Sequence, residues 1–175
     1  LKLSYNPQVI EQLHFVERNS KYLLSLVNQL MDFRKVESGK LEIVKSRNNF
    51  LKFANELIIP FEVFAKERDI TVKRYFRMPS PEISYDEEAM HKVLTNLLSN
   101  AIKFSNENSE VLVKMEEQGD TVVVSVKDSG CGIDEEGQQK LLHTDTHFST
   151  FGTNNEEGSG LGLLLCQDFA VKIGG

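Results

Sequence analysis

The sequence contains no tryptophan, only two cysteines and four prolines, and fewer basic than acidic residues. Cys131 and Cys166 show neither the spacing of a metal site nor the framework of a disulfide-rich secreted domain, so they fit a reducing compartment. No apolar stretch reaches the roughly 20 residues of a membrane span, and the N-terminus does not resemble a signal peptide. Because the net charge is −6 and no basic run is present, we expect no nucleic-acid partner.

What the sequence does contain is enough apolar material for a folded core. Hydrophobic residues make up 40% and charged residues 26% of the 175 positions, which is typical of a soluble globular protein. A chain of this length accommodates one ordinary domain plus an added element.

The residues from Asp86 to Phe104 form the most strongly patterned stretch of the chain. Their apolar side chains recur at three- and four-residue spacing, which predicts an amphipathic helix with a broad buried face. Asp86 is suited to cap its start, and Glu87 and Glu88 suit the positive end of the helix dipole. The apolar positions are Met90, Val93, Leu94, Leu97, Leu98, Ala101 and Ile102.

Three polar residues of this helix share one stripe, because Asn96, Asn100 and Lys103 are four and three residues apart. Two neutral oxygen donors and one cation suit a metal ion and a phosphate chain. The alternative interpretation is that they merely occupy the exposed stripe of a helix.

Two glycine clusters follow the helix. Asp128-Ser129-Gly130-Cys131-Gly132 comes after a β-type run, and Gly158-Ser159-Gly160-Leu161-Gly162-Leu163 opens an apolar helical run. Either cluster alone could be only a tight turn. In this order, the helix and the two clusters closely resemble the N, G1 and G2 boxes of sensor histidine kinases. That family shares an ATP-binding fold with DNA gyrase, the clamp-type heat-shock chaperones and MutL, and the resemblance runs from about Asn19 to the last residue.

The resemblance implies an α+β fold, a two-layer α/β sandwich with a mixed sheet of the Bergerat type, preceded by a long dimerisation helix. Residues 1–40 would be the second helix of the dimerisation hairpin, and residues 41–175 the catalytic ATP-binding domain. In the family a further hairpin follows a glycine pair such as Gly174-Gly175, so we expect the last strands of the fold to be absent.

The N-terminal helix is expected over residues 7–36, ended by Gly39. Its apolar residues follow the 4-3 spacing of a heptad seam, which predicts packing against another helix, and the family resemblance implies a homodimer through this helix. The alternative is a lone amphipathic helix folded onto its own domain. The seam consists of Val9, Leu13, Val16, Leu23, Val27 and Leu30.

Periodicity and turn residues predict the remaining elements. A helix capped by Asn48 or Asn49 is expected to begin near Phe50. Gln118-Gly119-Asp120 is a hairpin signal between two strands. We expect strands over 41–44, 70–76, 83–85, 111–116 and 121–127, and a short helix over 135–142.

The family resemblance also assigns an ATP and Mg²⁺ site. Asp128 would accept a hydrogen bond from the adenine amino group, and Asn100 would supply an oxygen to Mg²⁺. Asn96 and Lys103 would contact phosphates, Phe104 would line the pocket, and a buried Asp128 would need such hydrogen-bond partners. The complete predicted ATP-binding set is Asn96, Asn100, Lys103, Phe104, Asp128, Gly130, Gly132, Gly158, Ser159, Gly160, Leu161 and Gly162.

The identity of residue 96 separates branches of this family. ATP-hydrolysing members carry a glutamate at the position of Asn96, where it activates water, and an asparagine cannot act as a general base. The sequence therefore favours a site that holds ATP for an external nucleophile.

Residues 143–157 match the position of the family's ATP lid, and Phe148 and Phe151 resemble the aromatics that anchor it. These aromatics could equally be plain core contacts, and the lid is acidic, since no Lys or Arg occurs between Lys140 and Lys172. His143 and His147 have the spacing of a helical metal pair but lack a helix-forming context, so we do not expect zinc there. His91 is expected at a surface position.

The resemblance implies transfer of the ATP γ-phosphoryl group to a histidine on an upstream helix, and from there to an aspartate of a response regulator. His14 is followed by Phe15, Val16 and Glu17, which does not match the family's phosphoacceptor motif, so we expect this chain alone to be inactive. The resemblance also implies a cytoplasmic location with membrane attachment through segments outside this chain. Two alternatives are a nucleotide-binding or dimerisation module without kinase turnover and a clamp-type ATPase.

Overall fold

The computed structural model describes residues 6–79, 81–142 and 161–175, and the chain divides into two units, Leu1–Leu41 and Glu42–Gly175. The first unit contains helix α1, Pro7–Glu37. Asn6 caps its start by accepting a hydrogen bond from the Gln8 N–H (3.0 Å), and Pro7 occupies the first helical position, where its missing N–H is not needed.

The C-terminus of α1 is closed by a glycine in the left-handed region, as the sequence predicts. Gly39 has φ +67°, its N–H donates to Val36 O (3.0 Å), and the Lys40 N–H donates to Lys35 O (2.9 Å). This pair of bonds is the Schellman motif, which satisfies carbonyls that the helix itself leaves free. The predicted helix over 7–36 is thus confirmed to within one residue.

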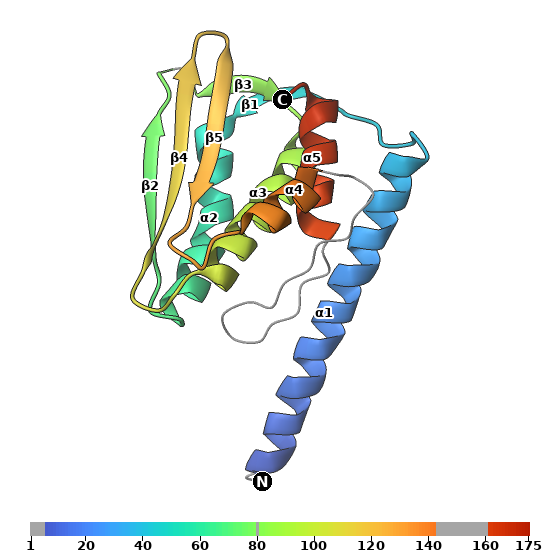
Figure 1. The fold of residues 1–175 in the computed structure, drawn as a ribbon, viewed down its shortest axis with the longest axis vertical. Coiled ribbons are helices and arrows are strands. Elements are labelled where there is room, and N and C mark those ends of the chain that lie inside the picture. Colours follow the sequence, from blue (N-terminus) through green and yellow to red (C-terminus); the bar gives the residue numbers. More distant parts are fainter. Residues whose placement is uncertain (1–5, 80, 143–160) are drawn as a thin grey trace, which may run out of the picture. The chain divides into compact units, whose positions relative to one another are not determined.

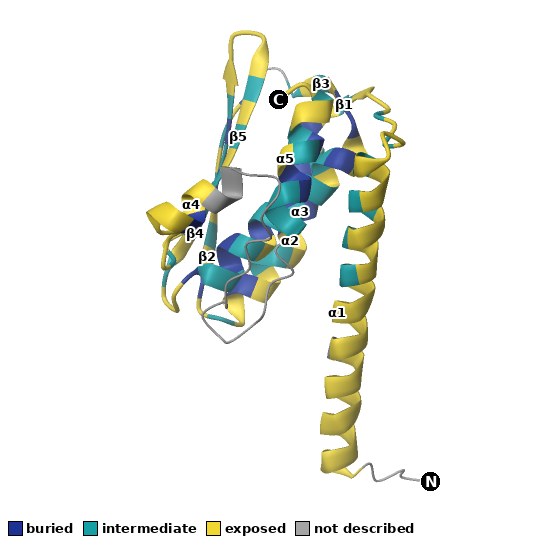
Figure 2. Ribbon diagram, turned by 45° about the vertical axis from the view of Figure 1, so that its right-hand side comes forward, coloured by how far each residue is buried: buried dark blue, intermediate teal, exposed yellow. Residues whose placement is uncertain are grey.

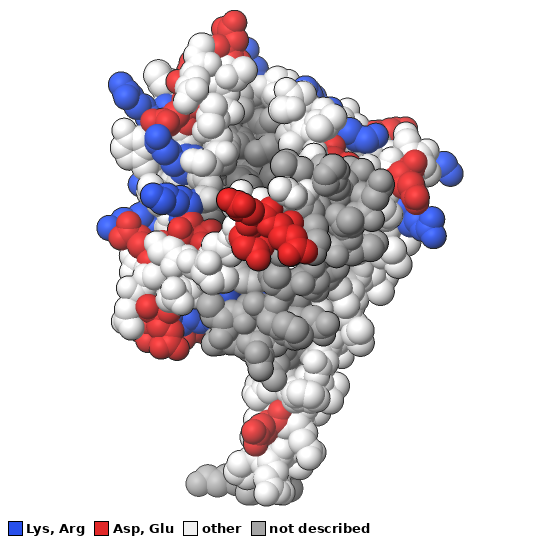
Figure 3. Space-filling model, in the orientation of Figure 1, with Lys and Arg blue, Asp and Glu red and all other residues white. Residues whose placement is uncertain are grey.

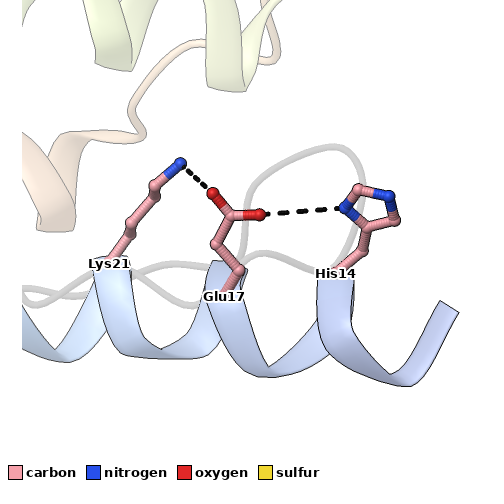
Figure 4. Close-up of polar contacts among 3 residues, drawn as sticks. All are labelled: His14, Glu17 and Lys21. Carbon is pink, nitrogen blue, oxygen red and sulfur yellow. Dashed lines mark hydrogen bonds and ion pairs between the residues drawn. The ribbon is translucent and has the colours of Figure 1, made fainter. Parts of the chain in front are cut away.

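Almost the whole surface of α1 is exposed (Figure 2). On one side of it, the Glu17 carboxylate lies 2.7 Å from Lys21 Nζ and 3.8 Å from His14 Nδ1 (Figure 4). The hydrogen bond from Lys21 is the main reason that the pKa of Glu17 lies below its ordinary value. All six seam residues named above are exposed as well.

The described residues of the second unit form two sheets, a mixed one of three strands and an antiparallel one of two strands (Figure 1). In the larger one, β4 (Glu110–Gln118) pairs in parallel with β2 (Thr71–Arg77) and antiparallel with β5 (Thr121–Lys127). In the smaller one, β1 (Ser46–Asn49) pairs antiparallel with β3 (Glu82–Tyr85). The predicted α+β class with a mixed sheet is confirmed.

Helices α2 (Phe50–Lys66) and α3 (Glu87–Phe104) pack on one face of the larger sheet, and α5 (Leu161–Ile173) packs against α3. The short helix α4 (Glu135–Leu142) has the predicted bounds. Strand alternation positions the core, because every second residue of β4 points toward the helices. The fully buried side chains include Phe50, Ile58, Leu94, Leu98, Ile102, Val111, Val113, Met115, Leu165 and Phe169.

Two strand predictions need correction. Residues 41–44 form no strand, because the Val44 N–H donates to the Asp86 carboxylate and the ladder starts only at the pair Ser46–Tyr85. The strand predicted at Ile70 begins one residue later, since the Ile70 N–H still donates to Ala65 O in the turn that ends α2. The hairpin, the strand near Ile83 and the Asn49 cap of α2 are confirmed.

Candidate functional site

Helix α3 carries the predicted polar stripe, and its own start is firmly fixed. Asp86 Oδ1 accepts the Ala89 N–H (2.8 Å), which confirms Asp86 as the N-cap, and Glu87 and Glu88 occupy the positive first turn. The apolar face of α3 is buried, which leaves Asn96, Asn100 and Lys103 partly exposed on the side of the helix.

The segment that precedes β1 makes hydrogen bonds to both α3 and α5. The sequence patterns did not indicate these contacts. Asp86 Oδ2 accepts the Val44 N–H, so one buried carboxylate caps α3 and fastens this segment. The next residue, Lys45, donates from Nζ to Ile173 O (2.7 Å) at the C-terminal end of α5. Neighbouring residues of one segment therefore attach to the start of α3 and the end of α5.

The structure brings Asn96 of α3 close to Gly162 of α5. A Cβ atom added to Gly162 would lie 3.1 Å from Asn96 Oδ1, so the first turn of α5 passes directly over this side chain. Leu161, the preceding residue, starts α5 and is partly buried.

Lys103 and Phe104 lie together at the C-terminal end of α3. The ammonium of Lys103 is 5.2 Å from the centre of the Phe104 ring, a cation–π distance. Both side chains are half-buried, so the ring supports a positive charge on the same stripe as the two asparagines.

The first glycine cluster is anchored to the end of α3 through its backbone. Ser105 and Gly130 form an antiparallel β-bridge, and a Cβ on Gly130 would overlap the carbonyl oxygen of Phe104. Glycine is therefore required at 130 for a close backbone approach. Gly132 is needed for a different reason, its φ of +70°.

Asp128 corrects one expectation. Its side chain is exposed rather than buried, and Oδ1 accepts the N–H of Gly130 two residues ahead (2.9 Å). The carboxylate thus shapes the turn through this hydrogen bond.

Several predicted residues lie outside the described ranges. These are Gly158, Ser159 and Gly160 of the second cluster, and Phe148, Phe151, His143 and His147 of the segment between the clusters. His91 lies on α3 and is exposed, as expected.

The charge near α4 is acidic. Glu135 and Glu136 occupy its first turn, and Figure 3 shows acidic side chains gathered over this helix, with basic ones toward the sheet. In the part of the chain that the structure describes, no three His, Cys, Asp or Glu side chains are grouped to hold a metal ion.

A hollow of about 490 Å³ lies at the other end of the sheet, beside Arg77, Pro79 and the β4–β5 turn. None of the predicted site residues lines it. Among the described helices, none combines the length and apolar character that crossing a membrane requires.

Comparison with known proteins points to one family. Residues 85–175 match the family described as histidine kinase-, DNA gyrase B-, and HSP90-like ATPase. The chain is 28% identical over 166 residues to a histidine kinase of Formosa agariphila, covering 93% of this chain and 12% of that protein. It is 27% identical over 180 residues to the signal transduction histidine-protein kinase BarA of Escherichia coli, covering 100% of this chain and 20% of that protein. The chain thus spans a fifth or less of these two relatives.

Solved structures share the fold. Full-length ShkA in complex with AMPPNP aligns with a TM-score of 0.76 at 22% identity, over 98% of this chain and 35% of that one. The catalytic domain of histidine kinase ThkA aligns with a TM-score of 0.62 at 27% identity, over 76% of this chain and 82% of that one.

Proposed function

This chain belongs to the histidine kinase-, DNA gyrase B-, and HSP90-like ATPase family, and we propose that it is the phosphoryl-donating part of a sensor histidine kinase. Residues 41–175 would be the catalytic ATP-binding domain, and residues 1–40 the second helix of a dimerisation hairpin. The relatives named above are histidine kinases, which supports this branch of the family over its other members.

The observation that carries the proposal is the meeting of Asn96 on α3 with Gly162 on α5. It joins two segments that are 66 positions apart in sequence, and both belong to the predicted phosphate side of the site. Asn96 is also the residue that decides the chemistry, since an amide has no basic group with which to activate water. The site is therefore suited to binding ATP without hydrolysing it.

In the proposed reaction, a histidine ring nitrogen attacks the γ-phosphorus, the bond to the bridging oxygen breaks, and ADP leaves. Magnesium, when bound, neutralises charge on the phosphates during this transfer. Asn100 fits the role of its protein ligand, because it offers a neutral oxygen one turn from Asn96 on a partly exposed stripe. Lys103 and the N-terminal turn of α5 would bind phosphate oxygens. Asp128 would accept the adenine amino group.

The acceptor histidine is proposed to lie outside this chain. The chain has four histidines. The structure describes two of them: His14 is exposed on α1 with its Nδ1 3.8 Å from the Glu17 carboxylate, and His91 is exposed on α3. Neither has the histidine–acid sequence that the family uses, so transfer would need a preceding helix.

Three partner relationships follow as proposals. The exposed seam of α1 would pair with a second copy of this helix. The phosphoryl group would pass to a response regulator, as the solved complex of ThkA with the response regulator TrrA illustrates for that kinase. Attachment to a membrane would come through segments beyond this chain, with this part on the cytoplasmic side.

The test uses γ-labelled ATP and magnesium. We expect this chain to bind the nucleotide while releasing no labelled phosphate and acquiring no label. A version extended through a preceding helix that carries a His-Glu or His-Asp pair should acquire acid-labile phosphate. Release of phosphate would instead support a hydrolysing ATPase. Binding without any transfer in the extended version would support a nucleotide-dependent module, and labelling of the 175-residue chain would refute the assignment of the acceptor.

A further inference from the structure

The contact between α3 and α5 contains more than apolar packing. Leu165 and Phe169 are buried in it, and the ammonium of Lys92 lies 5.4 Å from the centre of the Phe169 ring. Cys166 is also buried, on the same side of α5. This interface therefore fixes the distance between the two helices that carry the proposed phosphate side of the site.

Gly162 leaves just enough room for one side chain of α3. A Cβ atom at this position would lie 3.1 Å from Asn96 Oδ1 and 3.5 Å from Asn96 Cγ. The first of these distances is tighter than ordinary Cβ contacts, so an alanine would displace the amide by a few tenths of an ångström. Gly162 lies within helix α5 and its φ is not positive, so the absence of a side chain matters here for space.

Cys166 follows Gly162 by four residues and so lies one turn further along the same face of α5. Its thiol donates to the carbonyl oxygen of Val93 (3.7 Å), one turn before Asn96 on α3. Burial raises the pKa of Cys166 to about 12, and a hydrogen bond with the Asn96 side chain opposes that rise. The thiol therefore remains protonated at neutral pH.

These contacts distinguish the two ends of the Asn96 amide. A thiol whose proton is directed to Val93 O has sulfur lone pairs left, and these can accept only from an N–H group. A hydrogen bond between the two side chains would therefore run from the amino group of Asn96 to the sulfur of Cys166, which agrees with Oδ1 lying against Gly162. An amide has the same shape in both orientations, so such a partner is what selects one of them.

We propose that Gly162 and Cys166 are positioning residues that hold the Asn96 side chain in one rotamer and one amide orientation for the phosphate chain of the nucleotide. Gly162 provides the space and Cys166 provides the directing hydrogen bond. This inference rests on the proposed function, because it assumes that Asn96 contacts the nucleotide.

The experiment measures affinity for Mg-ATP, and for ADP without magnesium, by calorimetry on the whole chain. Gly162→Ala, Cys166→Ala and Cys166→Ser are compared with wild type, each also in an Asn96→Ala background. Val171→Ala is the matched control, because Val171 lies on α5 with 68% of its surface exposed. Circular dichroism and thermal melts accompany every variant.

We expect Cys166→Ala to weaken Mg-ATP binding roughly three- to tenfold, the usual effect of one hydrogen bond. Cys166→Ser should retain most of the affinity, because a hydroxyl can both donate to Val93 O and accept from Asn96. Gly162→Ala should weaken Mg-ATP binding while keeping or raising the melting temperature, since alanine is the better helix former. ADP binding without magnesium should change little in all three variants.

The Asn96→Ala background decides between positioning and direct contact. If both α5 residues act through Asn96, neither substitution at Gly162 or Cys166 causes further loss in that background. Equal losses in both backgrounds would overturn the inference, as would wild-type affinity in Gly162→Ala and Cys166→Ala. Unchanged Mg-ATP affinity in Asn96→Ala itself would instead refute the proposed role of Asn96.

Discussion

Helices α1 and α3 carry the same kind of sequence pattern but differ in what covers their apolar faces. On α3, Leu94 and Leu98 are 1% and 0% exposed. On α1, Leu13 and Leu23 are each 61% exposed. Apolar periodicity therefore predicts where a helix forms and which face is apolar, but it does not identify the surface that buries that face.

The difference indicates two sources of stability. The unit Glu42–Gly175 has its own core between α2, α3 and the larger sheet, so it needs no second chain for that core. The apolar seam of α1 is uncovered along the whole helix, and exposed apolar surface of this kind is typical of an interaction site. We therefore expect core substitutions to affect unfolding and seam substitutions to affect association.

The largest effect is expected from Leu98→Ala. Removing a fully buried leucine should lower the free energy of unfolding by about 3 kcal/mol, since a cavity remains in the core. Leu13→Ala is the matched change on α1 and should cost less than about 0.5 kcal/mol when measured on the monomer. Urea denaturation at low protein concentration tests both. Equal losses of unfolding free energy in the two variants would show that the apolar faces of α1 and α3 are buried to the same extent.

A charge in the seam should act on self-association instead. Leu23→Lys places an ammonium where a heptad pair would pack, so the dimer should weaken about a hundredfold. Sedimentation equilibrium measures this, with Asn28→Lys, a polar position of the same helix, as the control. Unchanged association in Leu23→Lys would remove α1 as the dimer interface.

Asp86→Asn tests the hydrogen bond by which the Asp86 carboxylate holds the segment before β1. The amide oxygen can still cap α3, but its NH₂ group would face the Val44 N–H, so one hydrogen bond to a charged group is lost. The expected loss of stability is about 2 kcal/mol. Amide hydrogen exchange should show faster exchange at Val44 and preserved protection at Ala89. Loss of protection at both would mean that the cap fails as well.

A smaller effect concerns pH. The pKa of Cys166 is raised from 9.0 to about 12 in the folded chain, so above pH 9 the unfolded chain loses this proton first. The free energy of unfolding should therefore keep its full value below pH 9. It should fall as the pH rises toward 12, by about 1 kcal/mol at pH 10. Cys166→Ser should flatten this dependence between pH 8 and 10. A wild-type curve that is flat over that range would contradict the burial of the thiol.

Sequence patterns predicted α1, α3, α4 and the hairpin because their signals are local: caps, periodicity and a two-residue turn. They misplaced β1, because its residues Ser46–Asn49 are all polar and lack the apolar alternation that indicates a strand, yet they pair with β3. They grouped Asn96 with the glycines through family resemblance, whereas only the three-dimensional structure shows which glycine touches it. Arg74 on β2 donates to Asn55 and pairs with Glu62, both on α2, and no local sequence signal indicates these contacts between two elements.

The central claim is that the stripe on α3 binds the magnesium and phosphate part of ATP. The most direct measurement is a calorimetric titration of ATP with and without magnesium, on wild type and Asn100→Ala side by side. The account predicts that Asn100→Ala retains its affinity for magnesium-free ADP but loses the gain that magnesium gives to ATP. If Asn100 were only a surface residue, alanine would stabilise the helix by about 0.5 kcal/mol and leave the magnesium effect intact. That second result would contradict the account.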